Sequence, residues 1–167
     1  QRSWGEFSLS GVFTKFGEWS SRELPAGMFL PERKMGFREL SSEPLVTIYM
    51  PAYNCEEYVI ESIESALGQT YKNIEICIHD DGSTDRTLRK VKKKFRFNRK
   101  VKISSGANGG IGHASNSAIS KGTGELILQL DSDDILEPNA IEELLSLMKN
   151  DIVCSYGSFI RIDESGK

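Results

Sequence analysis

Beyond residue 44, short apolar runs alternate with segments whose apolar residues recur at helical spacing. The runs are rich in Ile, Val and Leu and are bounded by polar or turn-forming residues, which is typical of buried strands. We predict strands at residues 45–50, 74–79, 101–103, 125–130 and 152–156. Between them we predict helices of about 10–12 residues, and this alternation indicates an α/β fold with right-handed crossovers and a mainly parallel sheet.

Polar residues ahead of two of these helices indicate where the helices begin. Asn54 or Cys55 precedes the first helix, which would place Glu56 in its first turn, where the positive end of the helix dipole favours an acid. The serine and threonine at 83–84 are predicted to cap the second helix, which would run from about residue 85 to 95.

Residues 1–43 differ from the rest of the chain. They contain seven Trp and Phe residues, two prolines and several glycines, with no sustained strand or helix period. This composition is too aromatic for a free linker. We therefore predict an irregular segment, or the tail of a preceding domain, followed by a domain over residues 44–167. Because the chain starts at Gln1 without a signal-peptide pattern, we expect it to be a piece of a larger protein.

Composition and charge narrow the class of protein. The chain has 167 residues, is 38% apolar and carries a net charge of −3, so its overall charge gives no reason to expect nucleic acid binding. Its three cysteines are dispersed, which argues against a disulfide framework and fits a reducing, cytoplasmic environment. One stretch, residues 88–102, holds nine basic residues and no acid. It is either a solvated face or a site for an acidic polymer or anionic lipid at the inner face of a membrane.

Three polar clusters follow predicted strands, at residues 51–54, 80–83 and 131–134. In open parallel sheets, ligands bind beyond the carboxyl ends of the strands. Carboxylates gathered at one edge repel one another unless a cation joins them. The sequence therefore predicts an acidic crevice that takes a divalent cation.

The cluster at 131–134 has three carboxylates in four residues. Mg²⁺ and Mn²⁺ commonly take one or two carboxylates together with substrate phosphates, so this cluster is interpreted as a bridge to a diphosphate. The alternative is a turn that caps the helix starting at Pro138.

The other clusters each leave two interpretations open. Asp81 can accept an N–H from a nucleobase or belong to a turn and helix cap. Tyr53 can stack on a base or pack over the first helix. The glycine-rich loop at 108–112 lacks the spacing of a dinucleotide or Walker fingerprint and is at most a close-approach loop for a sugar nucleotide. His79 and His113 have no catalytic partner at recognisable spacing and are predicted to be structural.

Taken in order, these motifs resemble the nucleotide-binding half of a family-two glycosyltransferase with the Rossmann-like GT-A fold. The matching strings are PLVTIYMPAYNCEEY, DDGSTD, NGG and QLDSDDILEPNAIEEL, over about residues 44–165. Within that family they are most similar to a domain of the bacterial chondroitin and hyaluronan synthases.

The resemblance implies a UDP-sugar donor, a glycan acceptor, and roles for ten residues. Those expected to contact the nucleotide sugar are Pro51, Ala52, Tyr53, Glu56, Asp81, Asn108, Gly109, Asp131 and Ser132. Within this set, Asp81 would accept the uracil N–H. Asp133 is expected to ligate Mn²⁺ or Mg²⁺ at the diphosphate.

One part of the family pattern is missing. Inverting transfer needs a base for the acceptor hydroxyl, which in the family lies well beyond the Asp131 motif. The 33 residues after Asp134 contain no such group, and Asp163 and Glu164 sit in a surface-turn context. We therefore expect this stretch to bind donor but to transfer poorly, with the base beyond Lys167. The alternatives are a non-catalytic sugar-nucleotide-binding remnant, a nucleotidyltransferase, or a phospho-receiver module.

Overall fold

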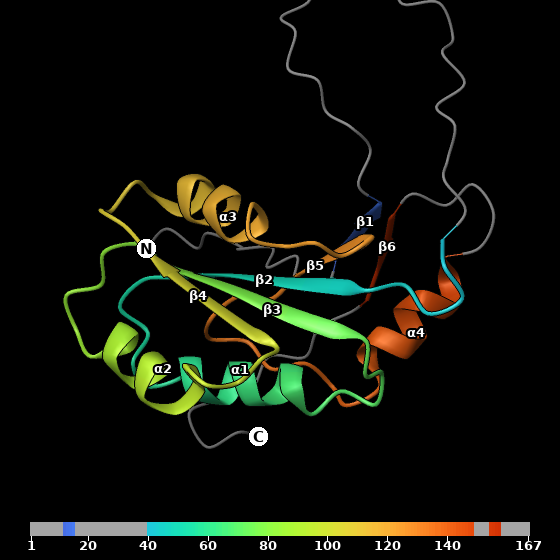
Figure 1. Ribbon diagram of the computed structural model, residues 1–167, viewed down its shortest axis with the longest axis horizontal. Helices are drawn as coiled ribbons and strands as arrows, with labels where there is room; N and C mark the ends of the chain where they lie inside the picture. The colour runs from blue at the N-terminus through green and yellow to red at the C-terminus, as the bar shows by residue number, and fades with distance from the viewer. Residues whose placement is uncertain (1–11, 16–39, 149–153, 158–167) are drawn as a thin grey trace, which may run out of the picture.

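The computed structural model describes residues 12–15, 40–148 and 154–157 (Figure 1). Within them lie six strands and four helices, which alternate along most of the chain. The strands are β1 (Val12–Lys15), β2 (Val46–Ala52), β3 (Ile74–Asp80), β4 (Val101–Ser105), β5 (Leu126–Gln129) and β6 (Cys154–Tyr156). The helices are α1 (Val59–Leu67), α2 (Thr87–Phe95), α3 (Ile111–Ile119) and α4 (Ala140–Leu147).

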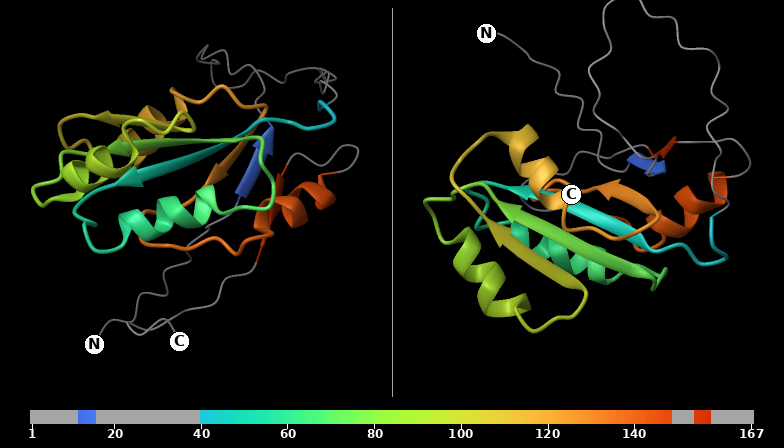
Figure 2. Two further views of the ribbon diagram at one scale, coloured as in Figure 1. Left: turned by 60° about the horizontal axis from the view of Figure 1, so that its bottom comes forward. Right: turned by 45° about the horizontal axis from the view of Figure 1, so that its top comes forward.

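One sheet contains all six strands in the order β4-β3-β2-β5-β1-β6. The β2–β3, β3–β4 and β2–β5 pairs are parallel, whereas β1 runs antiparallel to β5 and β6. Helices α1 and α2 cover one face of the sheet, and α3 covers the other (Figures 1 and 2). The predicted α/β fold with a mainly parallel sheet is confirmed.

The core lies on the central strands because those strands are buried on both faces. Every residue of β3 is buried, and in β2 only Tyr49 is partly exposed. Ile48, Ile76 and Leu128 are fully inaccessible to solvent. Burial of an aliphatic side chain of this size stabilises the fold by about 1.5–3 kcal/mol.

A buried carboxylate ties the sheet to the loop before β5. Glu75 on β3 accepts hydrogen bonds from Thr47 Oγ1 at 2.6 Å and from the backbone N–H of Thr123, and Lys102 Nζ lies 2.6 Å from it. Burial by itself would raise the pKa of Glu75, but the bonds from Lys102, Thr47 and Thr123 outweigh it and lower that pKa. The network fixes where β5 starts and therefore where its carboxyl end lies.

The structure differs from the predicted elements in two places. Residues 12–15 form β1, a strand between β5 and β6 in the same sheet, in a segment predicted to be irregular. Both helices after the first polar clusters also start later than predicted: α1 begins at Val59 and α2 at Thr87. Glu56 therefore precedes α1 instead of lying in its first turn. The reason is that the expected capping side chains bond to the neighbouring loop, as described below. The predicted strand residues 152 and 153 lie outside the described residues.

Candidate functional site

The carboxyl ends of β2, β3 and β5 meet at one edge of the sheet, on the left in Figure 1. Ala52 and Asp80 are register partners, and Asp81 N–H donates to the Ala52 carbonyl at 2.8 Å. On the other side, Leu130 N–H donates to the Tyr49 carbonyl at 3.1 Å. The three polar clusters therefore follow neighbouring strands, as the sequence predicted.

The loops after β2 and β3 are joined through Asn54. Its Oδ1 accepts the Thr84 N–H at 2.8 Å, and its own N–H donates to Ser83 Oγ at 3.0 Å. Asn54 has φ of +49°, a left-handed conformation that asparagine tolerates better than most residues. The side chains expected to cap helices are used in this junction instead. It leaves Tyr53 50% exposed at the edge, where a planar ligand can reach its ring.

The Glu56 side chain binds Arg86, the residue directly before α2. Its carboxylate accepts the Arg86 N–H at 2.7 Å and pairs with the Arg86 guanidinium at 2.8 Å. These side-chain and backbone bonds from Arg86 lower the pKa of Glu56 to about 2. Pro51 and Ala52, which the resemblance placed near a uridine, are buried at the end of β2.

Asp81 connects the end of β3 to the glycine-rich loop before α3. Its oxygens accept the N–H groups of Gly109 at 2.9 Å and Gly110 at 2.8 Å, and Oδ1 lies 3.4 Å from His113 Nδ1. The hydrogen bond from the Gly109 N–H is the largest cause of the lowered pKa of Asp81. The bonds from Gly110 and His113 lower this pKa further, whereas burial raises it. The structure therefore brings together Asp81 and the 108–109 loop, which the sequence placed in one pocket.

The turn after Asp81 explains why a glycine occupies position 82. Gly82 has φ of +72°, and a Cβ there would lie 2.8 Å from the Asn108 backbone nitrogen. A side chain would therefore be strained by the backbone and would also push the Asn108 loop outward. The glycine lets the two loops pack closely beneath the site.

The 131–134 segment is held in place from both sides. Tyr49 Oη donates to Gln129 Oε1 at 2.8 Å, and Gln129 Nε2 donates to Asp131 Oδ1 at 3.1 Å. The Ser132 carbonyl accepts a bond from Ser62 Oγ on α1 at 2.9 Å. Asp133 is exposed at the tip of this turn. The partly buried Asp131 and the exposed Asp133 therefore offer hard oxygen donors that suit Mg²⁺ or Mn²⁺.

Sequence reasoning missed the positions of the two histidines. His79 and His113, predicted to be structural, lie with Asp81, and the three residues offer ligand atoms within 4.8 Å of one another. The only signals in the sequence are that His79 directly precedes the acid pair and that His113 follows the glycines. Their juxtaposition depends on how α3 packs across β3.

In open α/β sheets, ligands bind in the crevice beyond the carboxyl ends of the strands, which is where this chain gathers its carboxylates. Residues 47–167 match the family model for Glycosyl transferase family 2, and the chain belongs to that family. The predicted family is thereby confirmed.

Several bacterial synthases are similar to the chain. It is 44% identical over 137 residues to chondroitin synthase from Escherichia coli, covering 81% of this chain and 20% of that protein. It is 46% identical over 125 residues to hyaluronan synthase from Pasteurella multocida, covering 74% of this chain and 13% of that protein. The chain thus spans a fifth or less of the length of these relatives.

Solved structures support the GT-A fold. S. aureus TarS 1-349 in complex with UDP-GlcNAc superposes with a TM-score of 0.57 and 32% identity, covering 62% of this chain and 30% of that one. Mannosyltransferase PcManGT from Pyrobaculum calidifontis, in complex with GDP-Man and Mn²⁺, superposes with a TM-score of 0.51 and 27% identity, covering 55% of this chain and 28% of that one. The predicted GT-A fold is confirmed.

Proposed function

We propose that this chain is the donor-binding part of a metal-dependent glycosyltransferase that uses a UDP-sugar to extend a polysaccharide. The observation that carries the proposal is the meeting of Asp81, the 108–109 loop and the 131–134 turn at one sheet edge. The similarity to synthases of chondroitin and hyaluronan and to a UDP-GlcNAc complex supports this donor class.

The uridine would occupy the edge between the β2 and β3 loops. The half-exposed ring of Tyr53 offers a stacking surface for the base. Each Asp81 oxygen accepts one glycine N–H, and a carboxylate oxygen can accept two bonds, so a uracil N–H has an acceptor there. The backbone bonds keep this carboxylate ionised and correctly oriented before the ligand arrives.

The diphosphate would face the 131–134 turn. Asp133 would hold Mn²⁺ or Mg²⁺, with Asp131 oriented by Gln129 toward the ribose or the donor sugar. When bound, such an ion would supply positive charge against the charge that develops on the departing UDP. We further propose inverting transfer, in which a carboxylate outside the described residues takes the proton of the acceptor hydroxyl.

Thermal unfolding with UDP tests this proposal. In Mn²⁺, UDP at about 100 times its dissociation constant should stabilise the chain by about 2.7 kcal/mol, or roughly 5–10 °C in Tm. Asp133→Asn should lose the Mn²⁺-dependent part of that shift, whereas Glu137→Gln, an exposed acid on the same connection, should keep it. An equal UDP shift in the two variants would contradict the assignment of Asp133.

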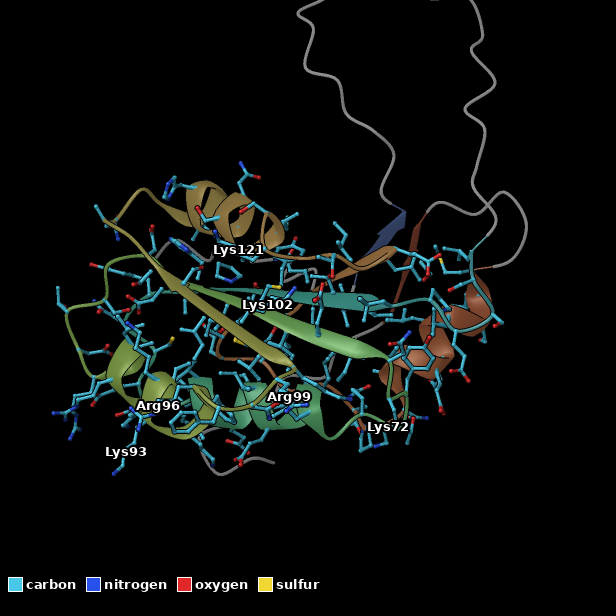
Figure 3. The ribbon with its side chains drawn as sticks, viewed as in Figure 1. Lys72, Lys93, Arg96, Arg99, Lys102 and Lys121 are labelled. Carbon is cyan, nitrogen blue, oxygen red and sulfur yellow. The ribbon has the colours of Figure 1, made fainter. Side chains whose placement is uncertain are left out.

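A second proposal concerns the basic run at residues 88–102, which the structure places on α2, the turn after it and the start of β4 (Figure 3). Arg86, Arg89, Lys90 and Lys93 line a hollow of about 460 Å³. Directly after α2, Phe97 is 83% exposed, with the Arg96 guanidinium 4.4 Å from its ring centre. Among the described residues, no helix is long and apolar enough to cross a membrane. A basic face with an exposed aromatic ring favours peripheral contact with an anionic lipid surface, which would be the inner membrane face of a cytoplasmic enzyme.

A further inference from the structure

His79 is a buried histidine with one nitrogen that has no hydrogen-bond partner. It lies on β3 and is 6% exposed. Its Nδ1 is 2.9 Å from Ser104 Oγ on β4, whereas its Nε2 is buried and makes no hydrogen bond with any described residue. Buried polar atoms in folded proteins nearly always have a partner, so this nitrogen requires an explanation.

The bond to Ser104 determines which nitrogen carries the proton. Ser104 Oγ lies 3.2 Å from the Ile78 carbonyl, and when it donates its single hydrogen there it accepts a bond from His79. In that arrangement His79 Nδ1 carries the proton, and Nε2 presents a lone pair. What is missing at Nε2 is a group that accepts electrons: a cation, or a donor hydrogen.

Two further ligand groups lie close to His79. Asp81 follows the end of β3, and His113 lies in the first turn of α3, with its Nδ1 3.4 Å from Asp81 Oδ1. The His79 and His113 rings meet edge to face with centroids 5.8 Å apart. Ligand atoms of the three residues all lie within 4.8 Å of one another, and the His113 side chain is 53% exposed, which gives an ion access from solvent.

We propose that His79, Asp81 and His113 form a zinc-binding site at the edge of the sheet. Two imidazoles and one carboxylate are a donor set that Zn²⁺ prefers, with the fourth tetrahedral position open to water. The Nδ1–H bond to Ser104 is the kind of outer contact that orients a metal-bound histidine. The site shares Asp81 with the proposed uridine site: after the two glycine bonds each carboxylate oxygen keeps one lone pair, one for Zn²⁺ and one for the uracil N–H. It differs in chemistry from the turn at 131–134, whose oxygen donors suit Mg²⁺ or Mn²⁺.

Calorimetric titration of Zn²⁺ into the chain, without a histidine tag and without nucleotide, tests the site. The chain has only two histidines, so binding that depends on histidine must use these residues. We expect one Zn²⁺ per chain, and His113→Gln should weaken its affinity by about 10- to 100-fold or more. His113 is exposed on a helix, so this variant should fold. Glu61→Gln, an exposed acid on α1 outside both proposed sites, is the control and should bind Zn²⁺ as the unaltered chain does.

Nitrogen NMR of the histidine rings gives a second readout. Without metal, His79 should show a protonated Nδ1 and a bare Nε2, and Zn²⁺ should shift the Nε2 resonance while Nδ1 stays protonated. Unchanged zinc affinity in His113→Gln, an unmoved Nε2 resonance, or loss of zinc binding in Cys55→Ser would overturn the proposal. The zinc titration contains no UDP, so a negative result there would leave the donor-site proposal unaffected. Equally, a failure to bind UDP would leave the zinc result unaffected.

Discussion

Replacing Gly82 with alanine tests the packing beneath the candidate site. Gly82 has φ of +72°, and an added Cβ would lie 2.8 Å from the Asn108 nitrogen and 3.2 Å from the Gly106 carbonyl oxygen. Both neighbours are backbone atoms, so neither can move out of the way by changing a rotamer. The loop that carries Asn108 and Gly109 has to shift.

The expected loss of stability has two parts. A left-handed conformation costs an L-residue about 1–2 kcal/mol. Forcing a methyl group into a packed site adds about 1–3 kcal/mol. We therefore expect Gly82→Ala to lower the free energy of unfolding by about 2–5 kcal/mol. UDP affinity should also fall, because the displaced loop carries two of the predicted nucleotide contacts.

Two other glycines serve as matched controls in urea unfolding. Gly110 also has positive φ, +84°, but no atom lies within 4 Å of its added Cβ, so Gly110→Ala measures strain without a clash. It should cost about 1–3 kcal/mol. Gly112 lies within α3 in open space, and Gly112→Ala should stabilise the chain by about 0.5–1 kcal/mol. If Gly82→Ala unfolded at the same urea concentration as Gly112→Ala, the described contact between the two loops would be wrong.

Three further predictions use other parts of the molecule. Tyr53→Ala should weaken UDP binding by about 5- to 150-fold, the equivalent of 1–3 kcal/mol of stacking, as measured by calorimetry; an unchanged affinity would exclude stacking. Because the pKa of Glu75 is lowered in the folded chain, its stabilisation is present above the unfolded pKa of about 4.3 and is lost as pH falls through the folded pKa. The unfolding free energy of Glu75→Gln should therefore change less over that acidic range than that of the unaltered chain. Parallel curves of unfolding free energy against pH for the two proteins would refute the stabilising role of ionised Glu75. Vesicles containing phosphatidylserine should retain the chain in flotation assays more than neutral vesicles do, and Phe97→Ser should reduce this retention; equal retention on neutral vesicles would contradict lipid contact through α2.

Much of the fold followed from local patterns. The apolar runs around Ile48, Ile76 and Leu128 are buried on both faces of the sheet, so continuous hydrophobicity identified them as strands. Once the sheet was predicted to be parallel, the polar residues after each run had to share an edge. The meeting of Asp81 with the 108–109 loop follows from that rule.

Other features depend on contacts between distant parts of the chain. The β1 strand pairs antiparallel with β5 and β6, more than 100 residues away, and nothing in its short sequence indicates that partner. The helix starts were misplaced because Asn54 bonds to Thr84 across two loops instead of capping its own helix. His79 and His113 meet only because α3 packs over β3, which no spacing in the sequence reveals.

In the proposed function, the carboxylates at this sheet edge form a metal-dependent UDP site. Calorimetric titration of UDP into the chain, with Mn²⁺ and then with a chelator in its place, tests it most directly. We predict saturable binding of one UDP per chain in Mn²⁺ and a large loss of affinity in the chelator. No measurable heat with Mn²⁺ present, at several temperatures, would exclude this UDP site.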